Sequence, residues 1–492
     1  MADQTDTAPR ATSNRSTTPN SDTFKQYIGS GWAERTDILP PEREEAAYAA
    51  ARRERLSKRY PGKRLLVPAG PAKQRSNDTD YPYRAHSAFT YLTGWGSDSE
   101  PGSVLVFDPQ AGGGHTVTLY FRERAGRDSD EFYANPEIGE FWIGPRPSLS
   151  QVAADLGLPT EHIASFSVAG ELDIDDTLLV PESDEGIFDA LLALEASHTG
   201  EARPIDDAPP LEQTLAEMRL VKDDYEIGQM RLAVAATARG FDDIVADLPR
   251  ITEHERGERM VEGIFNGRAR LDGNAVGYDT IAASGPHACI LHWTRNDGPV
   301  VPGDLMLVDA GVELDSYYTA DITRTLPVNG RFNVEQRMIY EAVREAADAA
   351  LAIVRPGIRF REIHQTAMGV IARKTAEWGL LPVTAEQAVE PENQQHRRYM
   401  VHGTSHHLGL DVHDCAKARR EMYLDGVLEA GMVFTIEPGL YFQPDDLTVP
   451  ESFRGIGVRI EDDILVTETG AENLSAGIPR TADEVERWLA RG

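Results

Sequence analysis

Cysteine is almost absent from this sequence, which holds only Cys289 and Cys415 in 492 residues. Two thiols cannot form the disulfide framework of a small secreted protein, so we expect a reducing compartment. Residues 1–25, rich in Thr, Ser, Asp and Pro, lack the apolar segment of a signal peptide and are expected to form a disordered tail. These features predict a cytoplasmic protein whose two cysteines are small core residues.

Positive charge is also scarce, because 49 Lys and Arg residues stand against 80 Asp and Glu residues, for a net charge of -31. Phosphate binding needs a basic surface, so this balance argues against nucleic acid or an anionic membrane as the main partner. The sequence also lacks a run of about 20 apolar residues that could span a bilayer. A solvated acidic surface accounts for most of the excess and leaves room for a few carboxylates around cations.

The length of the chain exceeds what one hydrophobic core usually organises, so we expect two domains. Short β-type runs that alternate with turns are typical of an α/β domain, which we place at 26–205. The second domain, 206–492, begins with an amphipathic helix over about 225–248, where apolar residues recur every three or four positions. Another helix is expected after Asn333, with Gln336 completing a capping box. Helix pairs that alternate with antiparallel strand pairs predict an α+β fold.

Four of the 13 histidines lie within HGTSHHLGLDVHD, residues 402–414. Such a run is compatible with a metal site, a proton relay or a polar surface loop. Histidines alone do not distinguish these possibilities, so the interpretation of this segment depends on the residues that accompany it in the fold.

Acidic residues stand at the ends of otherwise apolar strands, or inside them, in three segments of the second domain. Burying a carboxylate in a strand costs several kcal/mol unless it is paired or metal-bound. An ion pair with Arg324 or Arg459 explains one such acid, but not all of them beside a histidine-rich loop. The four acids are Asp309 after LMLV, Asp321 before ITRT, Glu437 after MVFTI and Glu461 within the expected strand GVRIEDDILV.

Four carboxylates and one imidazole form a ligand set that suits a pair of divalent cations. Oxygen-rich ligation favours manganese or magnesium, whereas the imidazole admits cobalt, zinc or iron. The residues alone do not say which acids bridge the two ions.

Several segments carry these residues in the order Asp, Asp, His, Glu, Glu: LVDAGVELDSYYTADITRTLPV, HGTSHHLGLDVHD, LEAGMVFTIEPGLYF and RGIGVRIEDDILVTETG. With RSNDTDYPYRAHSAFTYLTGW nearer the amino terminus, they resemble the proline-specific metallopeptidases of the pita-bread fold, and within them the Xaa-Pro aminopeptidases (aminopeptidase P). The resemblance runs from about residue 40 to the end of the chain. It implies a C-terminal pita-bread catalytic domain and a smaller N-terminal α/β domain of the creatinase-N type.

The resemblance also implies two divalent metal ions, with Mn2+ favoured, and assigns their ligands. Asp321 and Glu461 would bridge both ions, and a metal-bridging hydroxide would be the nucleophile. Glu437 would hold this hydroxide and move its proton to the leaving nitrogen. The implied ligands are Asp309, Asp321, His406, Glu437 and Glu461.

The remaining histidines of interest receive separate roles from the same resemblance. His292 and His413 match catalytic positions that face the substrate, and His402 matches a catalytic position that lines the same cleft. His407 follows the metal ligand directly and is expected to pack or to lie on a rim.

Four further residues are expected to support the site or the substrate. Arg459 and Tyr441 would balance the acid cluster from its outer side. Asp78 of the N-terminal domain and Trp142 of a neighbouring subunit match positions that reach the active site in relatives. For Trp142, packing inside its own domain core is an equal alternative.

The implied function is hydrolysis of the amino-terminal Xaa-Pro bond of peptides with proline in second position, by a homodimer or homotetramer. Prolidase, which cleaves Xaa-Pro dipeptides, shares all five ligands and is the main alternative. Methionine aminopeptidase shares them too, but it is disfavoured by the additional N-terminal domain. Creatinase-like enzymes and pita-bread binding proteins work without metal and lose the acids that this chain keeps.

Overall fold

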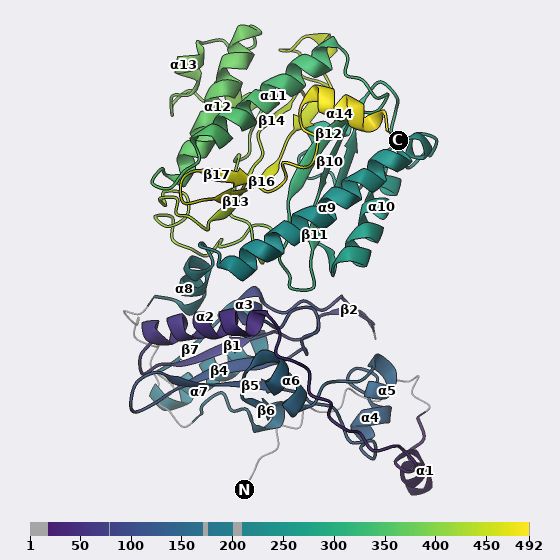
Figure 1. The fold of residues 1–492 in the computed structure, drawn as a ribbon, viewed down its shortest axis with the longest axis vertical. Coiled ribbons are helices and arrows are strands. Elements are labelled where there is room, and N and C mark those ends of the chain that lie inside the picture. The colour runs from purple at the N-terminus through teal and green to yellow at the C-terminus, as the bar shows by residue number, and fades with distance from the viewer. Residues whose placement is uncertain (1–17, 78, 171–175, 200–208, 492) are drawn as a thin grey trace.

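The computed structural model describes residues 18–77, 79–170, 176–199 and 209–491. Two units are stacked along the long axis of the molecule, with α8 (Leu211–Met218) and the start of α9 (Asp224–Ile251) near their junction (Figure 1). The boundary expected at residue 205 falls within 200–208, outside the described residues. Among the described helices, none combines the length and the apolar character needed to cross a membrane.

A five-stranded mixed sheet in the order β6-β5-β4-β1-β7 forms the centre of the N-terminal unit. Its antiparallel central strands are rich in Leu, Val and Phe, and their side chains pack against residues of α2 and α3 in a buried cluster. The strands are β1 (Arg64–Pro68), β4 (Val104–Pro109), β5 (His115–Phe121), β6 (Thr160–His162) and β7 (Thr177–Leu179), beside a hairpin of β2 (Gln74–Ser76) and β3 (Thr79–Asp80). The helices are α1 (Asp22–Ile28), α2 (Glu45–Arg59), α3 (Ser87–Thr93), α4 (Asp130–Ala134), α5 (Glu140–Ile143), α6 (Leu149–Leu156) and α7 (Glu185–Thr199).

Part of the segment expected to be a disordered tail is helical. Residues 1–17 lie outside the described residues, but 22–25 belong to α1, which begins after Ser21. The Ser21 hydroxyl accepts a hydrogen bond from the backbone of Phe24 at 3.3 Å. Lys25 Nζ donates to Asp130 at 2.9 Å, so α1 is also held against α4. The cap and this contact correct the expectation that the tail extends to residue 25.

Four small antiparallel sheets lie at the centre of the described C-terminal unit, and the helix pairs α9–α10 and α11–α12 pack around them (Figure 1). Their strands are β8 (Ala275–Val276), β9 (Ile281–Ser284), β10 (Leu305–Ala310), β11 (Val312–Glu313), β12 (Ile322–Pro327), β13 (Val433–Ile436), β14 (Gly439–Tyr441), β15 (Gly457–Arg459), β16 (Asp462–Val466) and β17 (Ala471–Asn473). The further helices are α10 (Gly257–Asp272), α11 (Val334–Ile353), α12 (Phe360–Glu377), α13 (Ala385–Ala388) and α14 (Ala482–Leu489). This mixture of sheets and covering helices confirms the α+β class.

Both helices expected from periodicity and capping are confirmed. The long helix α9 spans the predicted 225–248 and buries Met230, Phe241 and Ile244 on one face. Helix α11 begins after Asn333, whose side chain accepts a hydrogen bond from the backbone of Gln336 at 2.8 Å.

The segment GVRIEDDILV is not the single strand that its composition predicts. Its first part, β15, pairs with β14, whereas its second part, β16, pairs with β13 in another sheet. The chain crosses between the sheets at Glu461, whose backbone N–H donates to the carbonyl of Thr323 at 3.1 Å. Glu461 therefore lies at a crossover between two sheets and not inside a strand.

The N-terminal unit holds the histidine-rich segment directly. Arg84 Nη2 donates to the carbonyl of Leu410 at 2.5 Å, and Arg84 Nε donates to Glu313 at 2.7 Å. The hydroxyl of Ser87 donates to Asp411 in the same segment. These contacts attach Leu410 and Asp411 of the histidine-rich segment to Arg84, which precedes α3, and to Ser87, its first residue.

Candidate active site

Asp309 and Asp321 come from neighbouring strands. Asp309 lies in β10, where it pairs with Thr323 of β12, and Asp321 directly precedes β12. A Cβ at Gly311 would overlap the carbonyl oxygen of Ala320, so only glycine permits this close return of the chain. The close approach keeps both carboxylates on one wall of the same cavity.

Glu437 and Glu461 enter this cavity from two other sheets. Glu437 directly follows β13, and its backbone N–H donates to the carbonyl of Thr404 at 2.9 Å. Glu461 accepts a hydrogen bond from the hydroxyl of Thr323 at 2.6 Å. Each acid is thus fixed by a threonine of a neighbouring segment, and the four acids converge although up to 152 positions separate them.

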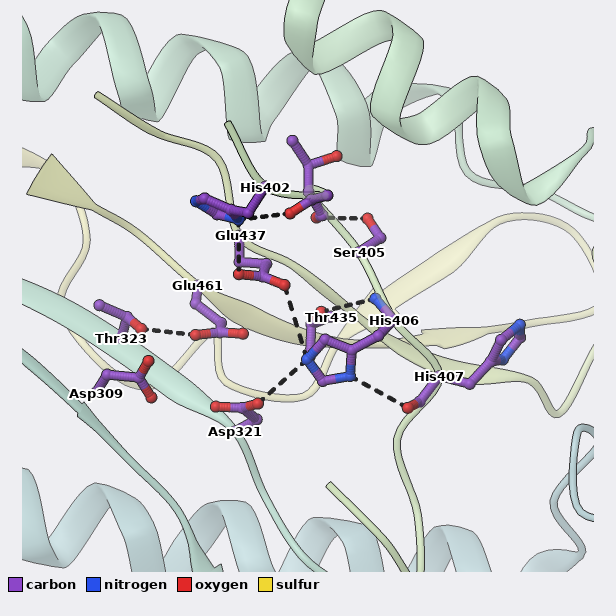
Figure 2. Close-up of polar contacts among 12 residues, drawn as sticks. Asp309, Asp321, Thr323, His402, Ser405, His406, His407, Thr435, Glu437 and Glu461 are labelled. Atoms are coloured by element: carbon purple, nitrogen blue, oxygen red, sulfur yellow. Dashed lines mark hydrogen bonds and ion pairs between the residues drawn. The ribbon is translucent and has the colours of Figure 1, made fainter. Parts of the chain in front are cut away.

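His406 turns its ring toward two of the acids, Asp321 and Glu437 (Figure 2). Its Nε2 lies 3.3 Å from Asp321 Oδ2 and 3.7 Å from Glu437 Oε1, while its Nδ1 lies 3.2 Å from the carbonyl of His407. The carbonyl contact assigns the proton to Nδ1 and leaves Nε2 facing the carboxylates.

Burial dominates the electrostatics of the acids. It raises the pKa of Asp321, raises that of Glu437 to about 7, and raises that of Glu461 well above its ordinary value, with repulsion between the carboxylates adding to the effect. For His406, burial opposes protonation, but the hydrogen bond with Asp321 and the charge of Glu437 outweigh it and raise its pKa to about 9. The cluster thus holds more negative charge than its surroundings compensate.

This donor set fits divalent cations. Asp321, His406 and Glu461 each offer a ligand atom, and these atoms lie within 4.8 Å of one another. Carboxylate oxygens and a neutral imidazole nitrogen suit hard and borderline dications, which would relieve the repulsion between buried acids. The buried side of the set includes one cation, Arg459, whose Nη2 lies 2.5 Å from Asp309 Oδ2.

The structure brings the other three expected histidines to the same cavity, which has a volume of about 630 Å³. His402 Nε2 lies 2.8 Å from the hydroxyl of Tyr441, and burial lowers its pKa to about 3. The ring of His413 meets the ring of His406 edge-on at 4.3 Å. His292, in the loop that follows β9, also lines the cavity. In contrast, His407 is buried and stacks on Phe360 at 4.6 Å.

Arg459 and Tyr441 form the outer layer beside Asp309. Arg459 donates to the hydroxyl of Tyr441 at 3.1 Å and to the hydroxyl of Thr323 at 3.1 Å, in addition to its ion pair with Asp309. Because Thr323 also donates to Glu461, one short network joins the guanidinium to two acids.

Of the two remaining expected residues, Trp142 is the one that the structure describes, and it does not line the cavity within this chain. Asp78 lies outside the described residues. Trp142 lies in α5, at the opposite end of the N-terminal unit from the catalytic sheets, and its side chain is 55% exposed (Figure 1). Its indole N–H donates to the carbonyl of Tyr133 at 2.7 Å, while its ring remains open to solvent. The alternative that Trp142 packs in its domain core is therefore wrong.

Sequence reasoning missed Tyr278, which precedes β9. Its hydroxyl donates to Asp309 at 2.6 Å and also contacts Asp321, so it lies between the first two acids. The residue sits in GYDTIAASG, where a lone tyrosine gives no periodic or spacing signal. Thr323 donates to Glu461, and Thr435 accepts from the backbone of His406. The sequence does not distinguish either threonine from other β-branched residues in strands.

The fold and this site define a metallopeptidase with a separate N-terminal domain. Residues 228–468 match Metallopeptidase family M24, and residues 49–168 match the N-terminal domain of aminopeptidase P. Xaa-Pro aminopeptidase 2 of Streptomyces coelicolor is 51% identical over 465 residues, which cover 94% of each chain. The Xaa-Pro aminopeptidase of Escherichia coli is 36% identical over 87% of this chain and 94% of its own.

Solved structures agree with these relatives. The aminopeptidase PepP of Pseudomonas aeruginosa superposes with a TM-score of 0.75 at 32% identity, over 92% of this chain and 99% of its own. Aminopeptidase P of E. coli with the inhibitor Pro-Leu gives a TM-score of 0.76 at 32% identity over the same shares. The chain belongs to the Xaa-Pro aminopeptidase family, and it is a metal-dependent aminopeptidase of the pita-bread fold. The expected resemblance and fold are confirmed.

Proposed function

We propose that this enzyme removes the amino-terminal residue from peptides that carry proline in second position. The observation that carries the proposal is the convergence of four buried carboxylates and His406 on one cavity, in a chain 51% identical to an Xaa-Pro aminopeptidase. Prolidase remains the second candidate, because its activity would use the same acids on a shorter substrate.

The proposed metal centre holds two divalent ions, Mn2+ in the first instance. Asp321 and Glu461 would bridge the ions, Asp309 would bind only one of them, and His406 and Glu437 would bind the other. The mutual distances of Asp321, His406 and Glu461, all within 4.8 Å, support this arrangement. Such ions supply Lewis acidity, which polarises the scissile carbonyl and lowers the pKa of water.

The side chains around the metal centre orient the substrate and move protons. Glu437 Oε2, 3.5 Å from His402 Nδ1, is placed to take a proton from the attacking solvent and deliver it to the leaving proline nitrogen. His292 and His413 line the open side of the cavity, where their ring nitrogens can donate to the substrate carbonyl or to the leaving group. His402 is held by Tyr441, which fixes the orientation of its ring.

Subunit association forms part of the same proposal. Phe141, Trp142 and Ile143 are 61%, 55% and 59% exposed on α5, which is unusual for three consecutive large apolar residues. We assign this face to a homodimer or homotetramer contact through which Trp142 approaches the cavity of a neighbouring subunit. A cytoplasmic location, supported by two free buried cysteines, and a domain boundary near residue 205 complete the proposal.

The test measures metal content and peptide cleavage on the same preparation. Metal-free protein is titrated with Mn2+, Zn2+, Co2+ and Mg2+, and products are identified by mass spectrometry. The substrates are matched Xaa-Pro-Yaa, Xaa-Ala-Yaa and Xaa-Pro peptides. We expect cleavage of Xaa-Pro-Yaa alone or foremost, with two Mn2+ bound per chain. Cleavage restricted to the dipeptide would identify a prolidase, and no cleavage with any metal would overturn the proposal.

A further inference from the structure

A single buried carboxylate holds the loop that carries His292. Glu258 lies in the first turn of α10 and is fully buried, with 0% of its side chain exposed. Its Oε1 accepts hydrogen bonds from the backbone of Ser284 at 2.8 Å and from His287 Nδ1 at 2.7 Å. Its Oε2 accepts from the indole N–H of Trp293 at 2.9 Å and from the backbone of Gly298 at 2.7 Å.

All four donors belong to one stretch of chain, residues 284–298. Ser284 ends β9 and Gly298 lies at the far end of the loop, so the carboxylate ties both ends together. Between these ends, Leu291, His292 and Thr294 line the active-site cavity. Glu258 of α10 therefore holds the two ends of the loop whose middle part lines the cavity.

Packing around Glu258 leaves little freedom for another arrangement. The rings of His287 and Trp293 are stacked at 3.9 Å, which joins two of the four donors to each other. A Cβ on Gly298 would lie 2.9 Å from Glu258 Oε2 and 2.8 Å from the His287 ring. The loop thus needs glycine at 298 because the carboxylate is so close.

The next turn of α10 makes a second attachment to the same loop. Asn296 donates to Glu262 at 3.1 Å and to the carbonyl of Thr280 at 2.8 Å, while its Oδ1 accepts from Ala282 at 3.0 Å. Asn296 adopts a positive φ of 47°, which asparagine tolerates better than most residues. Two glutamates one turn apart on α10 therefore hold the loop at separate points.

Among the described residues, every hydrogen bond that the Glu258 carboxylate accepts comes from this loop. A buried carboxylate that accepts four hydrogen bonds is satisfied without a neighbouring arginine or lysine, and its partners reside on the catalytic loop and not on the core sheets. We infer that Glu258 is a positioning residue that sets the place of His292 relative to the metal ligands. The inference rests on the proposed function, in which His292 faces the substrate.

The experiment is a double-mutant cycle between Glu258→Gln and His292→Ala, measured as kcat and KM on a Xaa-Pro-Yaa peptide with Mn2+. Glutamine keeps the size of the side chain but places an NH2 group against donors, so the loop must shift. A displacement of about 1 Å at a reacting group costs about 100-fold in rate, so we expect kcat to fall by about that factor. Metal content is expected to stay unchanged. Glu255→Gln, on the exposed turn before α10, is the matched control and keeps full activity.

The decisive result is non-additivity. In the His292→Ala background, Glu258→Gln should cost less than about threefold, because the residue that it positions is already gone. Equal losses in both backgrounds would overturn the inference and assign Glu258 a purely structural role. Glu258→Asp, which retains the carboxylate, should recover part of kcat, and its failure to do so would also count against the inference.

A readout independent of activity covers the case in which Glu258→Gln folds poorly. The imidazole signals of His292, identified with the His292→Ala variant, report the cavity-facing part of the loop in a nitrogen-15 NMR spectrum. A shift of these signals in folded Glu258→Gln and Glu258→Asp variants supports the inference, and unchanged signals overturn it. If His292→Ala itself keeps full activity, the role assigned to His292 fails and the inference fails with it, whereas additive losses overturn only the inference. Absence of cleavage by the parent enzyme would instead overturn the proposed function.

Discussion

Nη2 of Arg459 lies 2.5 Å from Oδ2 of Asp309, with 4% and 11% of the two side chains exposed. Removing one partner of a buried ion pair leaves the other charge uncompensated and costs about 3–5 kcal/mol of stability. We expect this loss for Arg459→Ala in metal-free protein, measured by urea unfolding. With Mn2+ bound the loss should be smaller, because the ions compensate Asp309.

The control is Lys58→Ala, because the side chains of Lys58 and its partner Glu54 are 71% and 69% exposed. An exposed ion pair contributes about 0–1 kcal/mol, so this variant should unfold almost as the parent does. An Arg459→Ala loss that is the same with and without Mn2+ would contradict a metal site next to Asp309.

Substitution of the proposed bridging acids should remove both ions. Asp321→Ala and Glu461→Ala are expected to abolish peptide cleavage and to lower the metal content from two ions per chain toward none. Asp309→Ala, which withdraws a ligand from one ion, should leave about one ion bound. Metal analysis after dialysis measures the difference. One ion remaining in the Asp321→Ala or Glu461→Ala protein would show that the bridging assignment is wrong.

His413 should affect turnover without affecting metal content. Its ring lines the cavity and meets His406 edge-on at 4.3 Å, and among the described residues no carboxylate of the cluster forms a hydrogen bond with it. Loss of a proton-handling group costs at least about 100-fold, so His413→Ala should lower kcat by this factor. Steady-state kinetics and metal analysis on the same sample test the expectation. Loss of an ion would assign His413 to the metal centre.

His407 should be replaceable with a gain in stability. It is 1% exposed, neither ring nitrogen has a hydrogen-bond partner among the described residues, and its ring packs among Phe360, Tyr423 and Phe434. An unsatisfied buried polar group costs about 1–3 kcal/mol, so His407→Phe should raise the free energy of unfolding by an amount in this range. Urea unfolding measures it, with kcat as a control that should not change. If His407→Phe is less stable than the parent protein, the imidazole of His407 forms a hydrogen bond and the prediction is wrong.

Salt should stabilise the protein. The surplus of 31 negative charges repels itself in the compact state. Raising NaCl from about 0.1 M to about 1 M shortens the Debye length from about 10 Å to about 3 Å, which screens this repulsion. The same screening weakens exposed ion pairs, but these contribute little individually. The free energy of unfolding should therefore rise with NaCl in a urea titration, and a fall would show that ion pairs dominate.

Local rules predicted the long elements well. The three- and four-residue spacing of apolar side chains in α9 and the Asn333–Gln336 cap of α11 depend only on nearby residues. The apolar segment 457–466 divides between two sheets, against its local pattern, because the division depends on a distant partner. The backbone of Glu461 bonds to Thr323, 138 positions away, and no local pattern encodes that contact.

In the site, too, the sequence reveals residues with a local signal and not those that depend on distant contacts. Acids beside apolar strands stand out in a sequence, because their burial demands a partner. Tyr278, Thr323 and Glu258 carry no such signal, since a hydroxyl or a helix-surface glutamate is ordinary in its local context. Their importance comes from side-chain hydrogen bonds that exist only after the sheets and loops have assembled.

Arg84 donates to the carbonyl of Leu410, and Ser87 donates to Asp411, so two residues of the N-terminal unit anchor the segment that contains His406 and His413. The position of the histidines in the catalytic unit therefore depends on contacts that the N-terminal unit supplies. Exchange of N-terminal halves between related enzymes, in evolution or by protein engineering, must preserve a donor for that carbonyl. A hybrid that lacks one would inherit every metal ligand and still misplace the loop that presents them.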